Sequence, residues 1–170
     1  MADFYDSLET RAPEQREREL FAALPAQLAH AQAHTEYFRR LLEGVDPAQI
    51  TSRESLAALP VTRKAEVPGL QKNLPPFGGL AASAPGAMAR VFASPGSMFE
   101  AQSHRADYWR CARALFAAGF RRGDLVHNTF SYHFTPAGAM IEAAAHGLGC
   151  AVFPAGGGQS ELQVNAITHF

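Results

Sequence analysis

Hydrophobic residues recur at helical spacing through the first half of the chain. Leu20 and Leu24 lie four residues apart, as they would on one face of a helix. The pattern predicts a helix over residues 14–23 and another over residues 37–43. Pro25 is expected to begin a new helix, because proline fits the first helical turn better than the interior. The amino-terminal region is therefore predicted to be helical, with breaks.

Capping and turn signals divide the rest of this region. Thr51 and Glu54 have the spacing of a capping box ahead of apolar positions, which predicts a short helix. Residues 74–86 are rich in proline, glycine, alanine and serine, and we expect them to form a surface loop. Residues 1–89 are interpreted as a helical amino-terminal region that ends in a connecting loop.

The pattern changes at Arg90, after which short apolar runs alternate with helical spacing. Strands that alternate with helices of about 10–15 residues are typical of parallel strands joined by right-handed crossovers. The predicted fold class is α/β, a parallel sheet with flanking helices behind the helical amino-terminal region. Residues 90–170 would form a partial α/β nucleotide- or acyl-binding subdomain, with strands at 90–93, 125–130 and 150–153 and helices at 103–118, 136–146 and from Ser160 onward.

The last predicted helix carries its own signals. Ser160 and Gln163 have capping-box spacing, and Val164 and Ile167 are expected to mark the buried side of the helix. The sequence ends at Phe170, directly after this helix. A parallel sheet of three strands would leave an edge exposed, so we expect these residues to be part of a larger domain.

Composition and charge narrow the classes of function. The 170 residues are 47% hydrophobic and 18% charged, with a formal net charge of −1, which is typical of a globular protein. A nucleic-acid partner usually leaves a basic footprint, and the sequence has none. No run approaches the roughly 18 apolar residues of a membrane span, and residues 1–6 lack the features of a signal peptide. We expect a cytoplasmic protein without a nucleic-acid or membrane partner.

Neither the cysteines nor the paired histidines predict a metal site. Cys111 and Cys150 lie far apart in no metal-ligand spacing, and two buried thiols are favoured over one disulfide. His30 and His34 lie four residues apart on a predicted helix, but the glutamate of the zincin motif is missing. We interpret this histidine pair as solvated.

Three loops follow the predicted strands, at the edge where open parallel sheets bind ligands. The first, around Ser94, has small residues that can cradle phosphates, although such turns are more often structural and the Walker pattern is absent. The second is aromatic and suits a flat aromatic or acyl ligand, with Phe130 and Phe134 as core residues in the alternative interpretation. The third is the glycine run that begins at Gly156.

In this order, the segments resemble the phenylacetate–CoA ligase branch of the adenylate-forming enzymes, amino-terminal portion only. The similarity runs through the whole chain, and the most specific match is residues 157–163, Gly-Gly-Gln-Ser-Glu-Leu-Gln. The other matching runs are residues 44–47, 59–64, 90–94, 118–124 and 147–154.

The resemblance implies a reaction in two halves. A carboxylate, often of an aryl acid, attacks the α-phosphate of ATP, and coenzyme A then displaces AMP from the acyl-adenylate. Magnesium and cationic side chains offset the phosphate charge, and a mobile carboxyl-terminal domain supplies a lysine. The family implies ATP or AMP, Mg and coenzyme A as ligands, and this chain would be part of the large amino-terminal domain. The implied site residues are a phosphate-loop remnant (Ser94, Gly96, Ser97), an acyl pocket (Tyr132, His133, Phe134) and a crevice loop (Gly157, Gly158, Gln159).

The phosphate loop departs from the family pattern. Pro95 and Met98 interrupt it, and Phe99 and Glu100 stand where the family has glycine and lysine. Proline removes a backbone donor, the missing lysine removes a positive charge, and Glu100 adds a negative one. One charge-assisted hydrogen bond contributes roughly 1.5–3 kcal/mol, so we expect a clear loss of nucleotide affinity.

Three interpretations stay open at this point. The first is an amino-terminal fragment or degenerate relative of an ATP-dependent aryl- or acyl-acid–CoA ligase, not active alone and without a catalytic residue of its own. The second is a noncatalytic small-molecule-binding or scaffold module. The third is a partial domain whose sheet is completed by a partner chain or by another copy.

Overall fold

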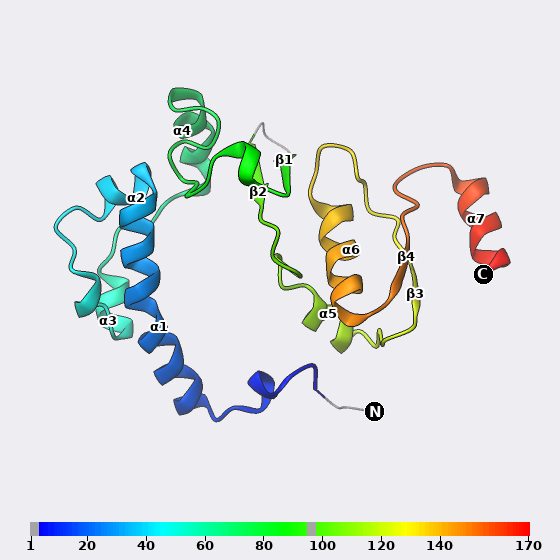
Figure 1. Ribbon diagram of the computed structural model, residues 1–170, viewed down its shortest axis with the longest axis horizontal. Helices are drawn as coiled ribbons and strands as arrows, with labels where there is room; N and C mark the ends of the chain where they lie inside the picture. The colour runs from blue at the N-terminus through cyan, green and yellow to red at the C-terminus, as the bar shows by residue number, and fades with distance from the viewer. Residues whose placement is uncertain (1–3, 95–97) are drawn as a thin grey trace. The chain divides into compact units, whose positions relative to one another are not determined.

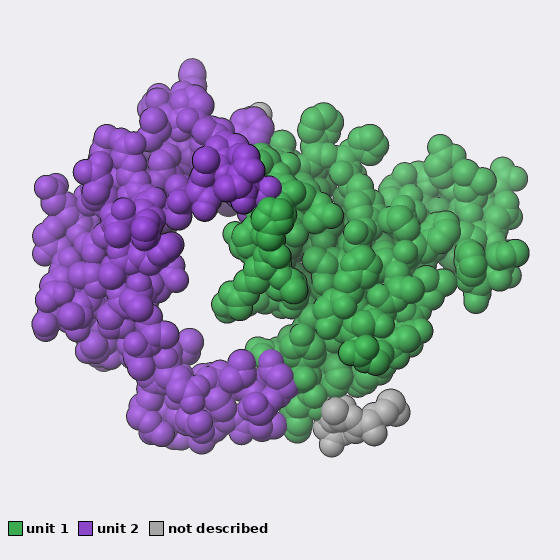
Figure 2. Space-filling model, in the orientation of Figure 1, with its two compact units in different colours: residues 1–5, 89–95, 102–170 green, residues 6–88, 96–101 purple. Residues whose placement is uncertain are grey.

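The computed structural model describes residues 4–94 and 98–170, which fold into two compact units (Figure 2). A helical unit comprises Asp6–Met88 with Gly96–Ala101. A sheet-containing unit comprises Ala89–Pro95 and Gln102–Phe170 with Met1–Tyr5. Gly96 and Ser97, both predicted in the phosphate loop, lie outside the described residues.

The helical unit is built on one long helix, α1 (Pro13–His34), which packs against α2 (Glu36–Leu41) (Figure 1). The predicted break at Pro25 is wrong, because Pro25 lies inside α1. Proline removes one helical hydrogen bond, but alanine and leucine neighbours favour the helix strongly enough to continue through it. The helix ends at Thr35, whose hydroxyl accepts a hydrogen bond from the Phe38 amide and so caps α2.

Shorter elements complete this unit. The predicted short helix exists as α3 (Arg53–Ala57), but its capping box is formed by Ser52 and Ser55 rather than Thr51 and Glu54. The Ser52 hydroxyl accepts from the Ser55 amide and the Ser55 hydroxyl accepts from the Ser52 amide. Serine can take the place of the usual glutamate, so the one-residue shift was not visible in the sequence. The remaining elements are α4 (Val67–Asn73) and the 3₁₀ turns η1 (Ser7–Thr10), η2 (Pro47–Gln49), η3 (Lys64–Glu66) and η4 (Pro85–Ala87).

The sheet-containing unit is organised around two parallel strands, β3 (Leu125–His127) and β4 (Ala151–Phe153). Helix α6 (Ala137–Leu148) connects them and ends at Gly149, whose φ of 82° favours glycine. Helix α5 (Ala112–Ala117) packs against α6. The core consists of Ala112, Val126, Ala144, Ala145, Leu148 and Cys150.

The prediction of three parallel strands is wrong for the first strand. Strand β1 (Arg90–Ser94) forms a separate two-stranded sheet with β2 (Met98–Gln102). A connection of residues 95–97 is too short for a crossover, and it keeps β1 beside the next segment of the chain. The sheet of parallel strands in the described residues is thus β3 with β4.

The predicted helix over residues 103–118 is wrong in its first half. Asp107 has a φ of 44° and Arg110 a φ of 58°, values that interrupt a right-handed helix. The Asp107 carboxylate accepts hydrogen bonds from the amides of Cys111 (2.9 Å) and Ala112 (3.2 Å). Those amides begin α5, so the aspartate satisfies the first donors of a short helix where the apolar spacing indicated a long one.

Both cysteines are free; Cys150 is buried and Cys111 is partly buried. Burial raises the pKa of each thiol above its ordinary value. The Cys150 thiol donates to the Arg121 carbonyl at 3.0 Å. In the described ranges, no helix combines the length and apolarity needed to cross a membrane.

The last helix, α7 (Ser160–His169), lies where the sequence predicts it, but its environment differs. Val164 is 58% exposed and Ile167 is 61% exposed, so the prediction that they mark a buried side is wrong. An apolar stripe identifies the face suited to burial, whereas burial itself requires a neighbouring element to pack there.

Candidate functional site

The candidate site starts from the carboxyl ends of β3 and β4. His127 and Phe153 are partners in the parallel register, and their rings stack with centroids 5.2 Å apart. The pairing continues past the strands, because the Asn128 amide donates to the Phe153 carbonyl at 3.0 Å and the Gly156 amide donates to the Asn128 carbonyl at 3.0 Å. The two loops that follow these strands therefore begin side by side.

Asn128 joins these loops to helix α6. It is 2% exposed, and its Nδ2 donates to the Tyr132 hydroxyl (2.8 Å) and to the Gly138 carbonyl (2.9 Å). Its Oδ1 accepts a hydrogen bond from the Phe130 amide at 3.2 Å. A buried amide with its donors and acceptor satisfied fixes the backbone around it. Sequence reasoning did not single out Asn128; the signal was a polar residue directly after an apolar strand.

The Tyr132 hydroxyl lies next to two polar side chains, the amide of Asn128 and the carboxylate of Glu142. Burial, followed by the neighbouring Glu142 carboxylate, raises the pKa of Tyr132 to about 12, while Asn128 and Arg90 act in the opposite direction. The phenol is therefore protonated near neutral pH. It presents an uncharged aromatic ring whose hydroxyl is fixed by Asn128.

The next two residues of the predicted acyl pocket lie in solvent. His133 is exposed, and Phe134 is 79% exposed with a φ of 58°. Phe130 is also exposed, so the interpretation of Phe130 and Phe134 as core residues is wrong. The Phe134 carbonyl accepts a hydrogen bond from the Ala93 amide at 2.8 Å. This bond brings the end of β1, and with it Ser94, next to the aromatic segment.

The glycine loop is shaped by Gln163 of α7. Gly156 and Gly158 have φ values of 68° and 80°, and Gln159 has 53°. The Gln163 Nε2 donates to the carbonyls of Gly156 (3.1 Å) and Gly158. Its Oε1 then accepts from His127 Nε2, 3.2 Å away. The predicted capping box of Ser160 and Gln163 is wrong, because Gln163 binds loop carbonyls and no side-chain cap exists.

The loop residues themselves are open to solvent. Gly157, Gly158 and Gln159 are all exposed, while Gly156 is close enough to Tyr132 that an added Cβ would lie 3.9 Å from its ring. Hydrogen bonds thus connect the end of β1, the aromatic segment and the glycine loop within one unit. Ligand binding by these residues stays a prediction.

The segment after Ser94 differs from an open phosphate loop. Met98–Gln102 form β2, and the Gln71 side chain binds both the amide and the carbonyl of Phe99 at 2.8 Å. Phe99 and Glu100 are therefore strand residues. The Phe99 amide is committed to the Gln71 side chain, so it is not a free donor for a phosphate.

No protein-family model matches the chain. A phenylacetate–coenzyme A ligase of Thermus thermophilus is 32% identical over 152 residues, which are 84% of this chain and 33% of that ligase. The same enzyme of Aromatoleum evansii is 33% identical over 83% of this chain and 33% of its own length. That of Pseudomonas putida is 32% identical over 97% of this chain and 38% of its own length. The chain spans about a third of the length of these relatives.

Solved structures of 2-hydroxyisobutyryl-CoA ligase have a similar fold. The ligase in complex with 2-HIB-AMP is 24% identical, with a TM-score of 0.81 over 92% of this chain and 34% of the ligase. The ligase with 2-HIB-AMP and CoA in the thioesterification state gives a TM-score of 0.81 over 94% of this chain and 36% of that chain. The chain adopts the fold of the corresponding third of such a ligase.

Proposed function

Because this chain belongs to the phenylacetate–CoA ligase-like branch of the adenylate-forming enzymes, of which it spans the amino-terminal portion, we propose that it contributes the acid-binding part of an ATP-dependent acid–CoA ligase. The ligand would be a small aromatic or acyl carboxylic acid. The chain alone would not complete the reaction, and we assign no catalytic residue within it.

The observation that carries this proposal is the network around Asn128. It connects a neutral, fixed tyrosine to the glycine loop, at the edge where parallel sheets bind ligands. Tyr132 offers a ring face to an aromatic acid, and the exposed ring of Phe134 offers a second apolar surface. The backbone amides of Gly157 and Gly158 would supply donors for the polar end of the ligand.

The two half-reactions of such a ligase require ATP and coenzyme A. When bound, ATP supplies the phosphate that activates the carboxylate as a mixed anhydride. The residues present fit this group poorly, because Phe99 and Glu100 occupy strand β2 and the lysine expected there is missing. A negative charge beside the phosphates opposes binding. We therefore expect acid binding to be better preserved than nucleotide binding.

Calorimetric titration of the 170-residue chain with phenylacetate tests this function. We expect saturable binding that Tyr132→Ala weakens at least about tenfold, because the ring face and its fixed orientation are lost together. Tyr108→Ala is the matched control, since Tyr108 packs on Trp109 outside this site and should leave the affinity unchanged. Equal binding by the Tyr132 variant would contradict the assignment of the site.

The altered phosphate loop favours a second candidate function, a noncatalytic module that binds the acid and has lost the nucleotide. Titration with ATP in the presence of magnesium separates the two. Micromolar ATP affinity would exclude the noncatalytic module, whereas phenylacetate binding without ATP binding would support it.

The exposed apolar residues of α7 favour a third interpretation, completion of the domain by further polypeptide. Sedimentation of the chain alone and with the later two-thirds of the Thermus thermophilus ligase would test it. Complex formation would support completion, and a stable monomer in both samples would count against it.

A further inference from the structure

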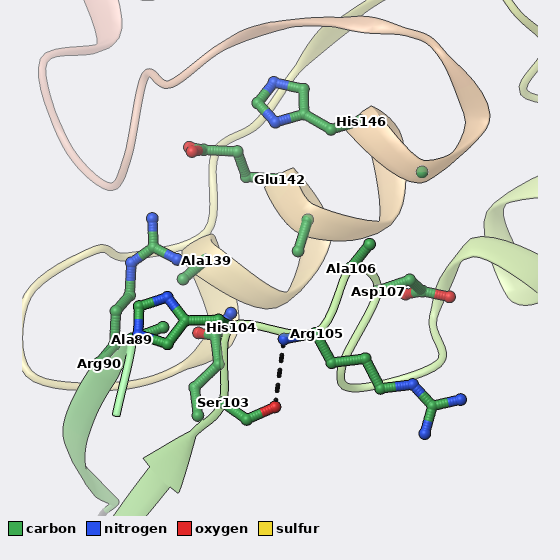
Figure 3. Close-up of a pocket in the computed structure, with 13 residues that line it drawn as sticks. Ala89, Arg90, Ser103, His104, Arg105, Ala106, Asp107, Ala139, Glu142 and His146 are labelled. Atoms are coloured by element: carbon green, nitrogen blue, oxygen red, sulfur yellow. Dashed lines mark hydrogen bonds between the residues drawn. The ribbon is translucent and has the colours of Figure 1, made fainter. Parts of the chain in front are cut away.

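A pocket of about 380 Å³ lies in the sheet-containing unit, apart from the candidate site (Figure 3). One wall is a single face of α6, formed by Ala139, Glu142, Ala143 and His146 at helical spacing. The facing walls are the start of β1 with Arg90 and the segment Gln102–Asp107. The volume is within the usual range of small-molecule sites.

Several polar groups of the pocket are already engaged by the protein. The Asp107 carboxylate accepts bonds from the amides that begin α5, and the Ser103 hydroxyl oxygen accepts from the Arg105 amide at 3.2 Å. The Arg105 side chain points away from α6 in Figure 3. The lining keeps one acidic and one basic side chain that face it, Glu142 and Arg90, and the Glu142 carboxylate also contacts the Tyr132 hydroxyl.

Arg90 and Glu142 line the same pocket without pairing. Within residues 4–94 and 98–170, no ion pair joins their side chains. The Arg90 side chain points toward α6, the helix that carries Glu142 (Figure 3). A simple anion would be attracted by Arg90 and repelled by Glu142, and a simple cation would be attracted by Glu142 and repelled by Arg90. A ligand that carries both charges satisfies both residues.

A third group of the pocket needs a hydrogen-bond donor. Gln102 is 4% exposed, and its Oε1 has no partner in the part of the chain that the structure describes. A buried acceptor without a donor costs free energy, and an N–H group from a ligand would remove that cost.

We propose that this pocket binds a small zwitterion of the α-amino-acid type. The carboxylate of the ligand pairs with the Arg90 guanidinium, and its ammonium donates to Glu142 and Gln102. This site is separate from the acid site at the strand ends and requires neither ATP nor an aromatic ring. It is connected to that site through Glu142 and Arg90, because both charges also act on the Tyr132 hydroxyl.

The test is an NMR titration of the isotope-labelled 170-residue chain with L-alanine, propionate and ethylamine. Propionate lacks the ammonium of alanine and ethylamine lacks its carboxylate, so the three probes separate the charges. We expect alanine to shift the amides of residues 102–107 and of α6 saturably, and to bind at least about tenfold tighter than either analogue.

Two variants and a control complete the experiment. Arg90→Met and Glu142→Gln should each weaken alanine binding at least about tenfold while leaving the circular dichroism spectrum unchanged. Arg16→Met, an exposed arginine in the helical unit, should have no effect. Alanine binding no tighter than propionate or ethylamine, or unaffected by both pocket variants, would overturn the proposal. Because no aromatic acid or nucleotide is present, this result is independent of the ligase proposal.

Discussion

Helices α6 and α7 each follow a loop after a parallel strand, but the two are held to the unit by different forces. Helix α6 buries Gly138, Ala139, Ala144, Ala145 and Leu148. Helix α7 has no buried residue and exposes Leu162, Val164 and Ile167. Its described attachments are the Gln163 hydrogen bonds and the Phe170 ring, 6.1 Å from that of Phe153. Hydrogen bonds and one ring contact thus position α7 while its apolar face stays exposed.

The largest effect on stability is expected when a buried residue of α6 is replaced by aspartate, and the same replacement on α7 serves as the comparison. Ala144→Asp puts a carboxylate at a position with 0% exposure, and should lower the free energy of unfolding by about 3–5 kcal/mol. Val164→Asp replaces a residue that is 58% exposed, and should change it by less than about 0.5 kcal/mol. Urea denaturation followed by circular dichroism measures both.

The Val164 variant also tests whether the apolar face of α7 is exposed in solution. A large destabilisation by Val164→Asp would mean that the apolar face of α7 is covered in solution. If the loss then grew with protein concentration, another copy of the chain would be the cover, because association links stability to concentration.

A smaller and local effect is expected at Gln163. Gln163→Ala removes the donors to the Gly156 and Gly158 carbonyls and the acceptor for His127, a loss of about 1–2 kcal/mol. Hydrogen exchange should show lower protection of the α7 amides and unchanged protection of α6. Asn165→Ala, at an exposed position of the same helix, is the control and should leave both unchanged. Equal loss of protection in both helices would show that they unfold as one unit.

The parts of this fold that sequence predicts well are those decided by neighbouring residues. The spacing of apolar positions identified β4, α6 and α7, because periodicity depends only on local order. The resemblance to phenylacetate–CoA ligases was recognisable from short runs such as residues 157–163, and relatives that are 32–33% identical over about a third of their length confirm it. Their order along the chain carried that recognition more than any single run.

The parts that sequence could not predict depend on contacts between distant residues. The pairing of β1 with β2 and the exposure of Val164 are decided by which elements meet. The roles of Asn128 and Gln163 became visible only from side-chain hydrogen bonds that span loops. Tyr132 was predicted for its ring, whereas its hydroxyl chemistry required the positions of Asn128 and Glu142.

An effect that is expected only at alkaline pH is a pH dependence on the α6 side of the site. The pKa of Tyr132 is raised from 10.0 to about 12, so between these values the unfolded chain loses a proton that the folded chain keeps. The stabilisation is fully present below pH 10 and is lost as the pH rises toward 12. Tyr132→Phe should flatten this part of the stability curve, measured by denaturation at stepped pH, whereas Tyr108→Phe should not. An unchanged slope in the Tyr132 variant would mean that α6 and Asn128 fix the position of the ring without raising the pKa of its hydroxyl. The α6 and α7 sides of the site would then differ less than their burial indicates.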